Sequence, residues 1–250
     1  MSDSKTPSNI MLSDRVAAEE LDGDQDMATA DTLRISEIFF SLQGESSWVG
    51  LPTVFIRLTG CPLRCVYCDT AYAFHGGTSI AVDAVVDKVA QWDAKHICVT
   101  GGEPLAQKNC LSLLRQLCDL DYQVSLETSG AIDIGDVDKR VKRIVDLKTP
   151  SSGEQAKNRY ENMPLLNSFD EVKFVISDRN DYQWSLQKVA EYELVKRSIA
   201  ILFSPVMAVA EGSVEPLLAS DLADWVVADS APVRMQLQLH KLIWGDQPGR

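Results

Sequence analysis

Apolar and polar positions along the chain alternate between two rhythms. Short apolar runs typical of buried strands lie at residues 53–58, 96–100, 123–128, 143–148, 171–176 and 199–204. Segments with apolar residues three and four apart indicate helices at 79–92, 108–120, 136–142 and 180–193. A helix near 214–219 and a last strand near 235–241 complete the predicted order.

Strands that alternate with helices predict parallel βαβ units. About six such units favour an α/β fold that is an incomplete TIM-like barrel, or an open parallel sheet, over a closed eightfold barrel. Reactive residues are expected at the carboxyl ends of the strands. The irregular stretch at 149–167 predicts a long loop at that same end.

Charge is concentrated at the amino-terminal end. Residues 1–31 hold eight acidic and two basic residues and no aromatic residue, a net charge of −6 out of −12 for the whole chain. This composition predicts an acidic disordered tail. Residues 32–250, within a chain that is 45% hydrophobic, are expected to form a single catalytic domain.

The composition also indicates which binding partners and which cellular location to expect. A strongly acidic chain argues against nonspecific nucleic-acid or anionic-membrane binding, both of which need basic patches. No apolar stretch approaches the length of a membrane span, and residues 1–31 lack the basic and apolar regions of a secretion signal. We therefore expect a soluble cytoplasmic protein.

Cys61, Cys65 and Cys68 form the pattern Cys-x3-Cys-x2-Cys directly after the strand predicted at 53–58. Three thiolates are one ligand short of a closed tetrahedral site, and one short of the four cysteines that hold an electron-transfer cluster. They therefore indicate an iron–sulfur cluster with one iron left open, where a reacting molecule can bind.

Other interpretations of the three thiols stay open from the residues alone. A distant fourth ligand would make a structural zinc site, and free thiols can pack as small hydrophobic groups. A disulfide framework is disfavoured by six cysteines in 250 residues and by the absence of a secretion signal. The remaining cysteines are predicted to be buried, reduced thiols: Cys98, Cys110 and Cys118.

Together, the cysteine pattern, Tyr67 before its last cysteine and the Gly-Gly-Glu-Pro at 101–104 resemble the radical S-adenosylmethionine superfamily. Narrower motifs are similar to those of the 7-carboxy-7-deazaguanine synthases. They lie at 37–45 (Glu-Ile-Phe-Phe-Ser-Leu-Gln-Gly-Glu), 57–61, 68–70, 127–130, 146–148, 171–175, 204–205 and 238–241. One position departs from the pattern, because Ser46 stands where glycine is expected, and this restricts the backbone of that loop.

The resemblance implies a carbon–nitrogen lyase. Members of this family convert 6-carboxy-5,6,7,8-tetrahydropterin to 7-carboxy-7-deazaguanine with loss of ammonia, on the route to queuosine and other 7-deazapurines. It also implies a [4Fe–4S] cluster on Cys61, Cys65 and Cys68, and S-adenosylmethionine bound through its amine and carboxylate to the open iron. The cofactor supplies the radical chemistry, and no catalytic residue is assigned beyond the cluster ligands.

Further site residues follow from the same resemblance. Those implied for S-adenosylmethionine are Tyr67, Cys68, Asp69, Gly102, Glu103, Ser129, Lys148 and Ser204. Glu103 or a neighbouring carbonyl is expected to accept from the methionine ammonium, and Glu127 is a further candidate. The glycine pair can also be a plain turn, and Ser129-Gly130 can also be a helix-capping turn.

A magnesium ion beside the substrate carboxylate is also implied, with Thr70 as its protein ligand, because Mg2+ takes oxygen ligands and keeps several waters. From the residues alone Thr70 is an ordinary turn residue. The residues implied for the substrate are Leu42, Gln43, Gly44, Glu45, Arg57, Thr100 and His240. His75 and His96 are expected to be packing residues.

Arg57 interrupts an apolar strand, and a buried guanidinium needs an anion. The substrate carboxylate suits it by bidentate geometry, and an internal ion pair is the alternative. A rival function is a radical enzyme that activates a glycine of a partner protein. Gln43, Gly44, Glu45, Arg57 and Thr70 favour a small carboxylated heterocycle instead. The resemblance further implies a flavodoxin or ferredoxin as electron donor and a homodimer.

Overall fold

The computed structural model describes residues 31–197, 199–207, 215–245, 247 and 249. Residues 1–30 of the predicted acidic tail lie outside the described residues, as does Val214 at the start of the helix expected near 214–219. Among the described helices, none is both long and apolar enough to cross a membrane.

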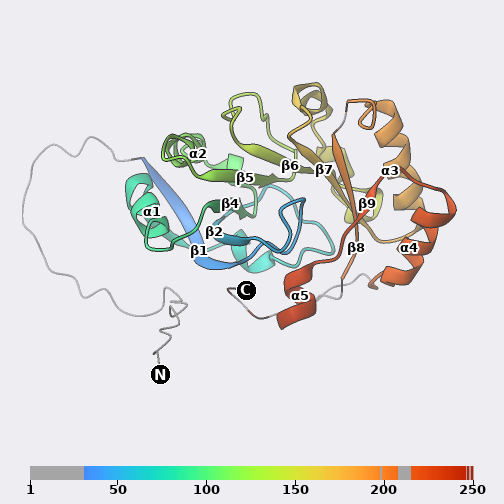
Figure 1. The fold of residues 1–250 in the computed structure, drawn as a ribbon, viewed down its shortest axis with the longest axis horizontal. Helices are drawn as coiled ribbons and strands as arrows, with labels where there is room; N and C mark the ends of the chain where they lie inside the picture. Colours follow the sequence, from blue (N-terminus) through green and yellow to red (C-terminus); the bar gives the residue numbers. More distant parts are fainter. Residues whose placement is uncertain (1–30, 198, 208–214, 246, 248, 250) are drawn as a thin grey trace, which may run out of the picture.

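A nine-stranded sheet in the order β3-β1-β2-β4-β5-β6-β7-β8-β9 forms the centre of the described structure (Figure 1). The strands are β1 (Thr32–Leu42), β2 (Pro52–Leu58), β3 (Thr78–Ala81), β4 (His96–Gly101), β5 (Gln123–Thr128), β6 (Lys142–Asp146), β7 (Glu171–Ile176), β8 (Ala200–Pro205) and β9 (Arg234–Met235). Neighbours from β2 to β9 are parallel, whereas β1 and β3 are antiparallel additions. The sheet stays open, with β3 and β9 as its edges, which confirms the predicted open parallel architecture.

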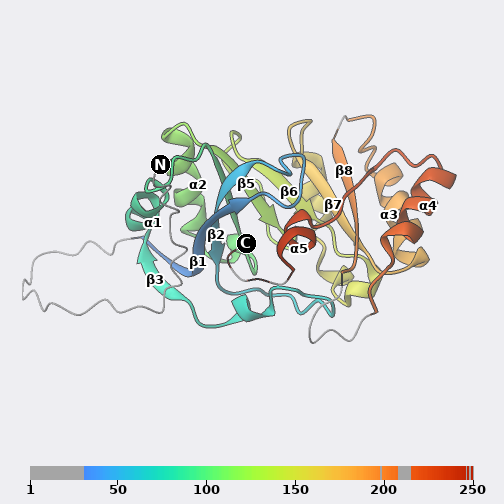
Figure 2. The same cartoon turned by 60° about the horizontal axis from the view of Figure 1, so that its bottom comes forward.

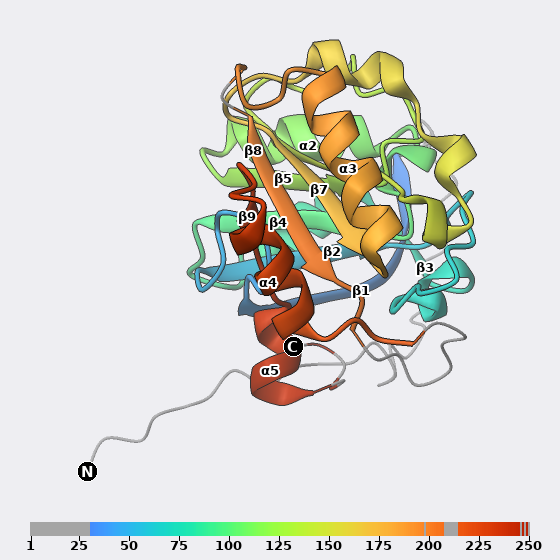
Figure 3. The ribbon, with the colours of Figure 1, turned by 90° about the vertical axis from the view of Figure 1, so that its right-hand side faces the viewer.

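Four helices cover the outer side of the curved sheet (Figures 1 and 3). They are α1 (Val82–Val89), α2 (Cys110–Asp119), α3 (Arg179–Glu191) and α4 (Ala219–Ala228). A short helix, α5 (Leu239–Trp244), lies apart from them (Figure 2). The irregular stretch predicted at 149–167 contains three short 3-10 helices at Pro150–Ser152, Gln155–Lys157 and Tyr160–Leu165.

The strands separate an apolar face from a polar one, as the period of two requires. In β2, Val54, Ile56 and Leu58 are fully buried in the core between sheet and helices. Phe55 and Arg57, on the other face of the same strand, line a pocket inside the curve of the sheet. Burying each aliphatic side chain contributes roughly 1.5–3 kcal/mol, so the outer face stabilises the fold and frees the inner face for polar groups.

The amino-terminal strand corrects one expectation. The pattern predicts no strand before residue 53, yet Thr32–Leu42 forms β1 and pairs with β2 along most of its length. The burial along β1 alternates irregularly, and its register with β2 shifts between Ile35 and Glu37. This irregularity hides the alternating signal of a strand in the sequence.

The helix predicted at 79–92 begins later. Residues 78–81 form β3 and pair antiparallel with β1 from Thr32 to Ile35. Ala81 has extended dihedrals, and no side chain caps α1. Pairing with β1 thus makes residues 78–81 a strand, although the sequence pattern would place them in the helix.

Two other predicted elements are wrong. Residues 136–141 form turns and bends rather than a helix. The Asp138 carboxylate accepts from the backbone N–H of Arg140, which favours a turn over a helix that is too short to nucleate alone. The last strand is only two residues long, and Gln238 leads instead into α5. The late helix is α4, which begins at Ala219 rather than near 214.

Candidate active site

A single pocket lies at the carboxyl ends of the parallel strands and collects most of the predicted site residues. Sixteen of them line it: Leu42, Gln43, Glu45, Arg57, Cys61, Cys65, Tyr67, Cys68, Asp69, Thr70, Thr100, Gly102, Ser129, Lys148, Ser204 and His240. Gly44 and Glu103 do not line it. Residues from β1 to α5 therefore meet in one cavity, although they are far apart in the sequence.

The cysteine loop follows β2 and forms one wall of the pocket. Its three thiols are partly exposed and free of disulfides, whereas Cys98, Cys110 and Cys118 are buried, as predicted. Burial raises the pKa of Cys61 and Cys68, and it raises that of Cys65 to about 11. The unliganded thiols therefore hold their protons at neutral pH, and metal binding must release them.

The loop is fixed to the rest of the fold by its backbone. Gly60 donates to the carbonyl of Ala73 at 2.8 Å, and Val66 donates to that of Ser152 at 3.1 Å. No group of three His, Cys, Asp or Glu side chains within the described ranges is arranged to hold a single metal ion.

The glycine pair after β4 lets the backbone approach the cysteine loop closely. Gly101 has φ +148°, and a Cβ there would lie 2.2 Å from the carbonyl oxygen of Leu58. A Cβ on Gly102 would lie 2.2 Å from the carbonyl oxygen of Gly60 and 2.8 Å from Cβ of Cys61. Any side chain at these positions would displace the wall that carries the cysteines.

Glu103, one of the two acceptors expected for the methionine ammonium beside a neighbouring carbonyl, does not line the pocket. Its side chain is fully buried and accepts from the hydroxyls of Thr128 at 2.9 Å and Ser129 at 2.5 Å. It also accepts from the backbone N–H groups of Ser129 and Leu105. The carboxylate therefore fixes the turn after β5, which brings Ser129 to the pocket wall.

A charged pair after β6 lies next to the cysteines. Lys148 and Asp146 are 3.0 Å apart, and both line the pocket. Burial opposes the charge on Lys148, but Asp146, Cys65 and Tyr67 together raise the pKa of the lysine, which stays protonated. Oδ1 of Asp146 and Oγ of Ser204 are buried with no hydrogen-bond partner among the described residues. Buried polar atoms without a hydrogen-bond partner are rare in native proteins, and these two indicate where a polar ligand can bind.

The opposite end of the pocket has a charged floor. Lys173 from β7 forms a buried ion pair with Glu45, which also accepts from Nε2 of Gln238 at 2.9 Å. Glu127 from β5 accepts from Thr100 at 3.0 Å and from Gln43 at 3.5 Å. All six side chains line the pocket.

Two carboxyl groups on this floor have opposite protonation tendencies. Burial would raise the pKa of Glu45, but the charge of Lys173 and the hydrogen bonds from Lys173 and Gln238 together lower it, so Glu45 is ionised. Burial and the nearby negative charge of Glu45 raise the pKa of Glu127. An ionised carboxylate and a carboxyl with a raised pKa thus stand side by side, a pattern common in sites that recognise or move protons.

Arg57 forms the internal ion pair that was the alternative to a substrate contact. Its Nε donates to Glu37 at 2.7 Å, and Glu37 also accepts from the hydroxyl of Tyr72 at 2.7 Å. The guanidinium lies 6.0 Å from the ring centre of Phe39 and 5.9 Å from that of Tyr72. Arg57 also lines the pocket, so the Glu37 pair holds it there.

The carboxyl-terminal segment crosses from the floor to the cysteine loop. Nε2 of Gln238 donates to Glu45 and, at 3.0 Å, to Asp69, and Lys241 pairs with Asp69 at 2.9 Å. The backbone N–H of Leu239 donates to the carbonyl of Gly44 at 2.9 Å. Gly44 is therefore a backbone contact beneath this segment rather than part of the pocket wall.

His240 packs directly on Gly44, where an added Cβ would lie 2.0 Å from its Nδ1. Burial lowers the pKa of His240, which keeps the ring neutral at physiological pH. Thr70 lines the pocket and donates to Oδ1 of Asp69 at 2.9 Å. His96 packs edge-on against Trp48 with the ring centres 5.2 Å apart, as expected of a packing residue, whereas His75 is exposed.

Sequence reasoning assigned no role to three pocket residues: Asp146, Lys173 and Gln238. Each had a signal. Lys173 interrupts an apolar strand, as Arg57 does, and Asp146 ends another. Gln238 was missed because the pattern near 235–241 predicted a strand, whereas the segment leads into α5.

Comparisons with known proteins agree with this geometry. Residues 55–196 match the family model described as the Radical SAM superfamily. A 7-carboxy-7-deazaguanine synthase of Chlorobaculum tepidum is 45% identical over 221 residues, which cover 87% of this chain and 97% of the relative. One from Koribacter versatilis is 40% identical over 222 residues, with 85% and 97% covered.

Solved structures show the same fold. The crystal structure of QueE from Escherichia coli superposes with a TM-score of 0.67 at 21% identity and covers 84% of this chain and 95% of that one. Streptococcus suis SuiB superposes with a TM-score of 0.54 at 12% identity, over 72% of this chain and 47% of that one. At these identities the likeness concerns architecture alone.

Proposed function

The chain belongs to the radical SAM superfamily and, within it, to the 7-carboxy-7-deazaguanine synthases, and from that premise we propose how its pocket works. It is a radical SAM lyase of 7-deazapurine biosynthesis. We infer that it converts 6-carboxy-5,6,7,8-tetrahydropterin to 7-carboxy-7-deazaguanine with loss of ammonia. The observation that carries this assignment is one pocket with three free thiols at one end and a charged floor at the other.

Cys61, Cys65 and Cys68 are proposed to hold the [4Fe–4S] cluster, with one iron open for S-adenosylmethionine. The donor set fits, since three unpaired thiols share one pocket and buried oxygens of Asp146 and Ser204 lack partners there. When bound, cluster and S-adenosylmethionine together supply the radical that starts the reaction. The protein's own residues orient both ligands and exclude water.

The cofactor wall is proposed to combine backbone and side-chain groups. The close approach at Gly102 supports binding of the methionine part against the backbone. Ser129, fixed by Glu103, and the cation of Lys148 are proposed to bind its polar ends. Glu103 thus acts through Ser129 and touches no ligand. Other proposed wall residues are Tyr67, Cys68, Asp69 and Ser204.

The charged floor is proposed to bind the pterin. The aminopyrimidinone edge of a pterin offers adjacent donors and acceptors, which Glu45, Glu127 and the Gln43 amide can match. Arg57, already aligned by Glu37, is proposed to contact the substrate carboxylate. The remaining substrate contacts proposed are Leu42, Gly44, Thr100 and His240, with Gly44 contributing only its backbone.

Mg2+ is proposed beside the substrate carboxylate, with the hydroxyl of Thr70 as its protein ligand. The position of Thr70 in the pocket wall supports this proposal. The expected test is Thr70→Ala, which should raise the Mg2+ concentration needed for half-maximal turnover while leaving cluster content unchanged. An unaltered Mg2+ dependence would reject Thr70 as ligand.

Several features outside the pocket are also proposals. We propose one catalytic domain at 32–250 preceded by an acidic tail, a homodimer, a cytoplasmic location and reduction by a flavodoxin or ferredoxin. They are supported by composition and by the family. Sedimentation velocity tests the homodimer, and reduction of the cluster by purified flavodoxin or ferredoxin tests the donor.

The proposed reaction is tested with protein reconstituted anaerobically with iron and sulfide. Carboxytetrahydropterin, S-adenosylmethionine, Mg2+ and dithionite are added, and the products are separated and weighed by mass spectrometry. We expect 7-carboxy-7-deazaguanine and ammonia in equal amounts. Cleavage of S-adenosylmethionine without any deazapurine would retain the superfamily and reject this substrate.

A further inference from the structure

The loop at 43–47 links the two ends of the open sheet. It follows β1, near one edge, yet its contacts reach the segment after β9, at the other edge. Gly44 accepts from the backbone of Leu239 at 2.9 Å, and the backbone N–H of Ser46 donates to Oε1 of Gln236 at 2.9 Å. The loop therefore closes the floor where the strands themselves do not pair.

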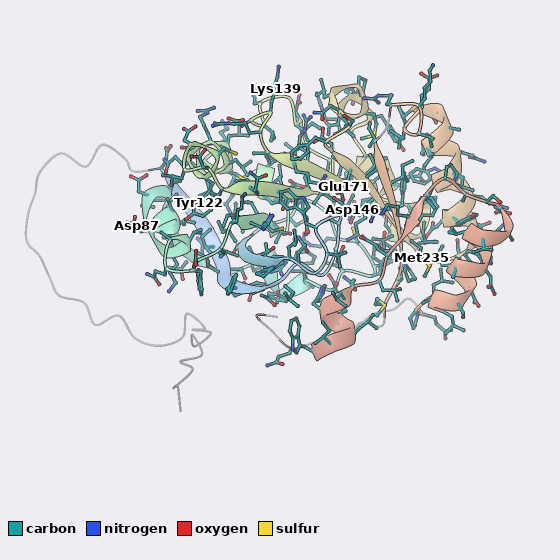
Figure 4. The ribbon with its side chains drawn as sticks, viewed as in Figure 1. Asp87, Tyr122, Lys139, Asp146, Glu171 and Met235 are labelled. Atoms are coloured by element: carbon teal, nitrogen blue, oxygen red, sulfur yellow. The ribbon has the colours of Figure 1, made fainter. Side chains whose placement is uncertain are left out.

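The inner face of β7 holds this loop at two successive positions. Side chains two residues apart on a strand share a face, and Lys173 and Val175 on this face line the pocket. Lys173 pairs with Glu45. One step further from the pocket, Glu171 holds Ser47. Figure 4 labels Glu171 near the middle of the molecule, close to the sheet.

Glu171 is fully buried and has several partners. Its two carboxylate oxygens accept from the backbone N–H of Ser47 at 3.1 and 3.2 Å, and one also accepts a short hydrogen bond from the Ser47 hydroxyl. Nζ of Lys142 lies 3.0 Å away and donates to the carbonyl of Phe169 at 2.6 Å. The carboxylate is thus neutralised and saturated by the loop and by β6.

None of these three residues is part of the pocket wall. Glu171, Ser47 and Lys142 are all absent from the lining, whereas Gln43 and Glu45, two and four residues before Ser47, belong to it. Glu171 can influence a bound molecule only through the loop. This buried ionic cluster lies outside the cavity, and Ser47 joins it to Glu45 of the floor, two residues earlier in the chain. Buried ion pairs are weak stabilisers, so stability alone does not explain the cluster.

We propose that Glu171 is a positioning residue for the pterin site, because it anchors Ser47 and so sets where Gln43 and Glu45 stand on the pocket floor. This inference rests on the proposed function, in which that floor binds the pterin. Misplacing binding groups by a fraction of an ångström weakens recognition steeply.

The backbone of the loop explains why an anchor is needed. Ser46 has φ +64°, in the left-handed region that is costly for a residue with a side chain. The following N–H, that of Ser47, points into the interior, where an unpaired donor would be unfavourable. A carboxylate accepts from both the N–H and the hydroxyl of Ser47 and carries the charge that Lys142 requires. An apolar side chain at position 171 would leave both groups unpaired.

The experiment compares Ser47→Ala and Glu171→Gln with the wild-type chain, all reconstituted with cluster. We expect both variants to raise KM for carboxytetrahydropterin about tenfold, which is the size of effect expected from weakening one charge-assisted hydrogen bond. The decrease in kcat should be smaller. Iron content and the dissociation constant of S-adenosylmethionine should not change. Ser185→Ala is the matched control, because it removes a buried serine hydroxyl bonded within α3 and should leave KM unaltered.

A purely stabilising role predicts a different result. If Ser47→Ala lowers the melting temperature but leaves KM within twofold of wild type, the positioning proposal is overturned. Should Glu171→Gln fail to fold, Ser47→Ala still decides the question, since it deletes one hydroxyl from a partly exposed loop residue. If the wild-type chain makes no deazapurine, the proposed function is rejected instead. The two failures are distinguishable, because the first is measured on the wild-type chain and the second on Ser47→Ala.

Discussion

The cysteine end of the pocket and its floor differ in how their polar groups are satisfied. At the cysteine end, the three thiols form no disulfide, and Oδ1 of Asp146 and Oγ of Ser204 have no hydrogen-bond partner among the described residues. On the floor, Glu45 and Glu127 are each bound by other side chains. The first region requires ligands to complete it, whereas the second is assembled by the protein itself. Substitutions should therefore affect cofactor loading at one end and protein stability at the other.

The largest expected effect is at the cysteine end. Cys65→Ala should abolish cluster binding and turnover, because two thiolates cannot hold a cubane that already has one open corner. Iron analysis and visible absorption after anaerobic reconstitution measure the loss. Cys118→Ala is the control, since that thiol is buried in α2 outside the pocket. A Cys65→Ala protein that stays brown would contradict the assignment.

The next effect is at the floor, in stability. Lys173→Met should lower the free energy of unfolding by about 3–5 kcal/mol, because it leaves the buried Glu45 carboxylate without its counter-ion. Urea unfolding of the apoprotein measures it. The double variant Lys173→Met with Glu45→Gln should recover most of the stability but not the turnover. If Lys173→Met is as stable as the wild type, the ion pair between Lys173 and Glu45 does not stabilise the floor, contrary to our account.

The pH dependence of stability sharpens the same comparison. Folding raises the pKa of Glu127 above its ordinary value of 4.5 through burial and Glu45. Its contribution to stability is therefore fully present below 4.5 and is lost as pH rises through the folded pKa. Glu127→Gln lacks this loss, so its stability relative to wild type should increase with pH, by at most about 1.4 kcal/mol per pH unit.

Thermal unfolding of the Glu127→Gln apoprotein between pH 4 and 8 tests the sign. Glu161→Gln, which removes a carboxyl group at an exposed position in Tyr160–Leu165, is the matched control. A Glu127→Gln protein that loses stability relative to wild type as pH rises would contradict the raised pKa.

The smallest effect concerns the loop that closes the floor. Ser46→Gly relieves a left-handed backbone but removes the hydroxyl that accepts from the N–H of Trp48. These changes oppose each other, and we expect a net change within about 0.5 kcal/mol. Ser46→Val keeps the strain, loses the hydroxyl and should cost at least about 1 kcal/mol. Equal melting temperatures for the two variants would show that the backbone at 46 carries no strain.

The sequence predicted regular elements well where one face is apolar throughout. β5 and β7 have the predicted bounds, and β2 differs by one residue, because their buried faces give a strong signal. It missed β1, whose register is irregular, and it misread residues 78–81 and 235–241, because pairing with β1 and contacts with the floor decide their conformation. Local pattern does not record such long-range partners.

For the site, the sequence predicted which residues line the pocket better than it predicted which partners their side chains contact. The cysteines, Ser129 and Lys148 line the pocket as expected. Glu103 points inward, because Thr128 and Ser129 offer it hydrogen bonds that the sequence cannot reveal. Arg57 was recognised as needing an anion, but its partner Glu37 comes from β1, the strand that the pattern failed to predict.

The central claim is that the cysteine end is an incomplete site that a sulfonium ligand completes. Electron paramagnetic resonance of the anaerobically reconstituted and reduced protein, recorded with and without S-adenosylmethionine, tests it most directly. The account predicts a [4Fe–4S] signal whose g values shift when S-adenosylmethionine is added, because the ligand coordinates the open iron. A cluster signal that does not respond to saturating S-adenosylmethionine would contradict it.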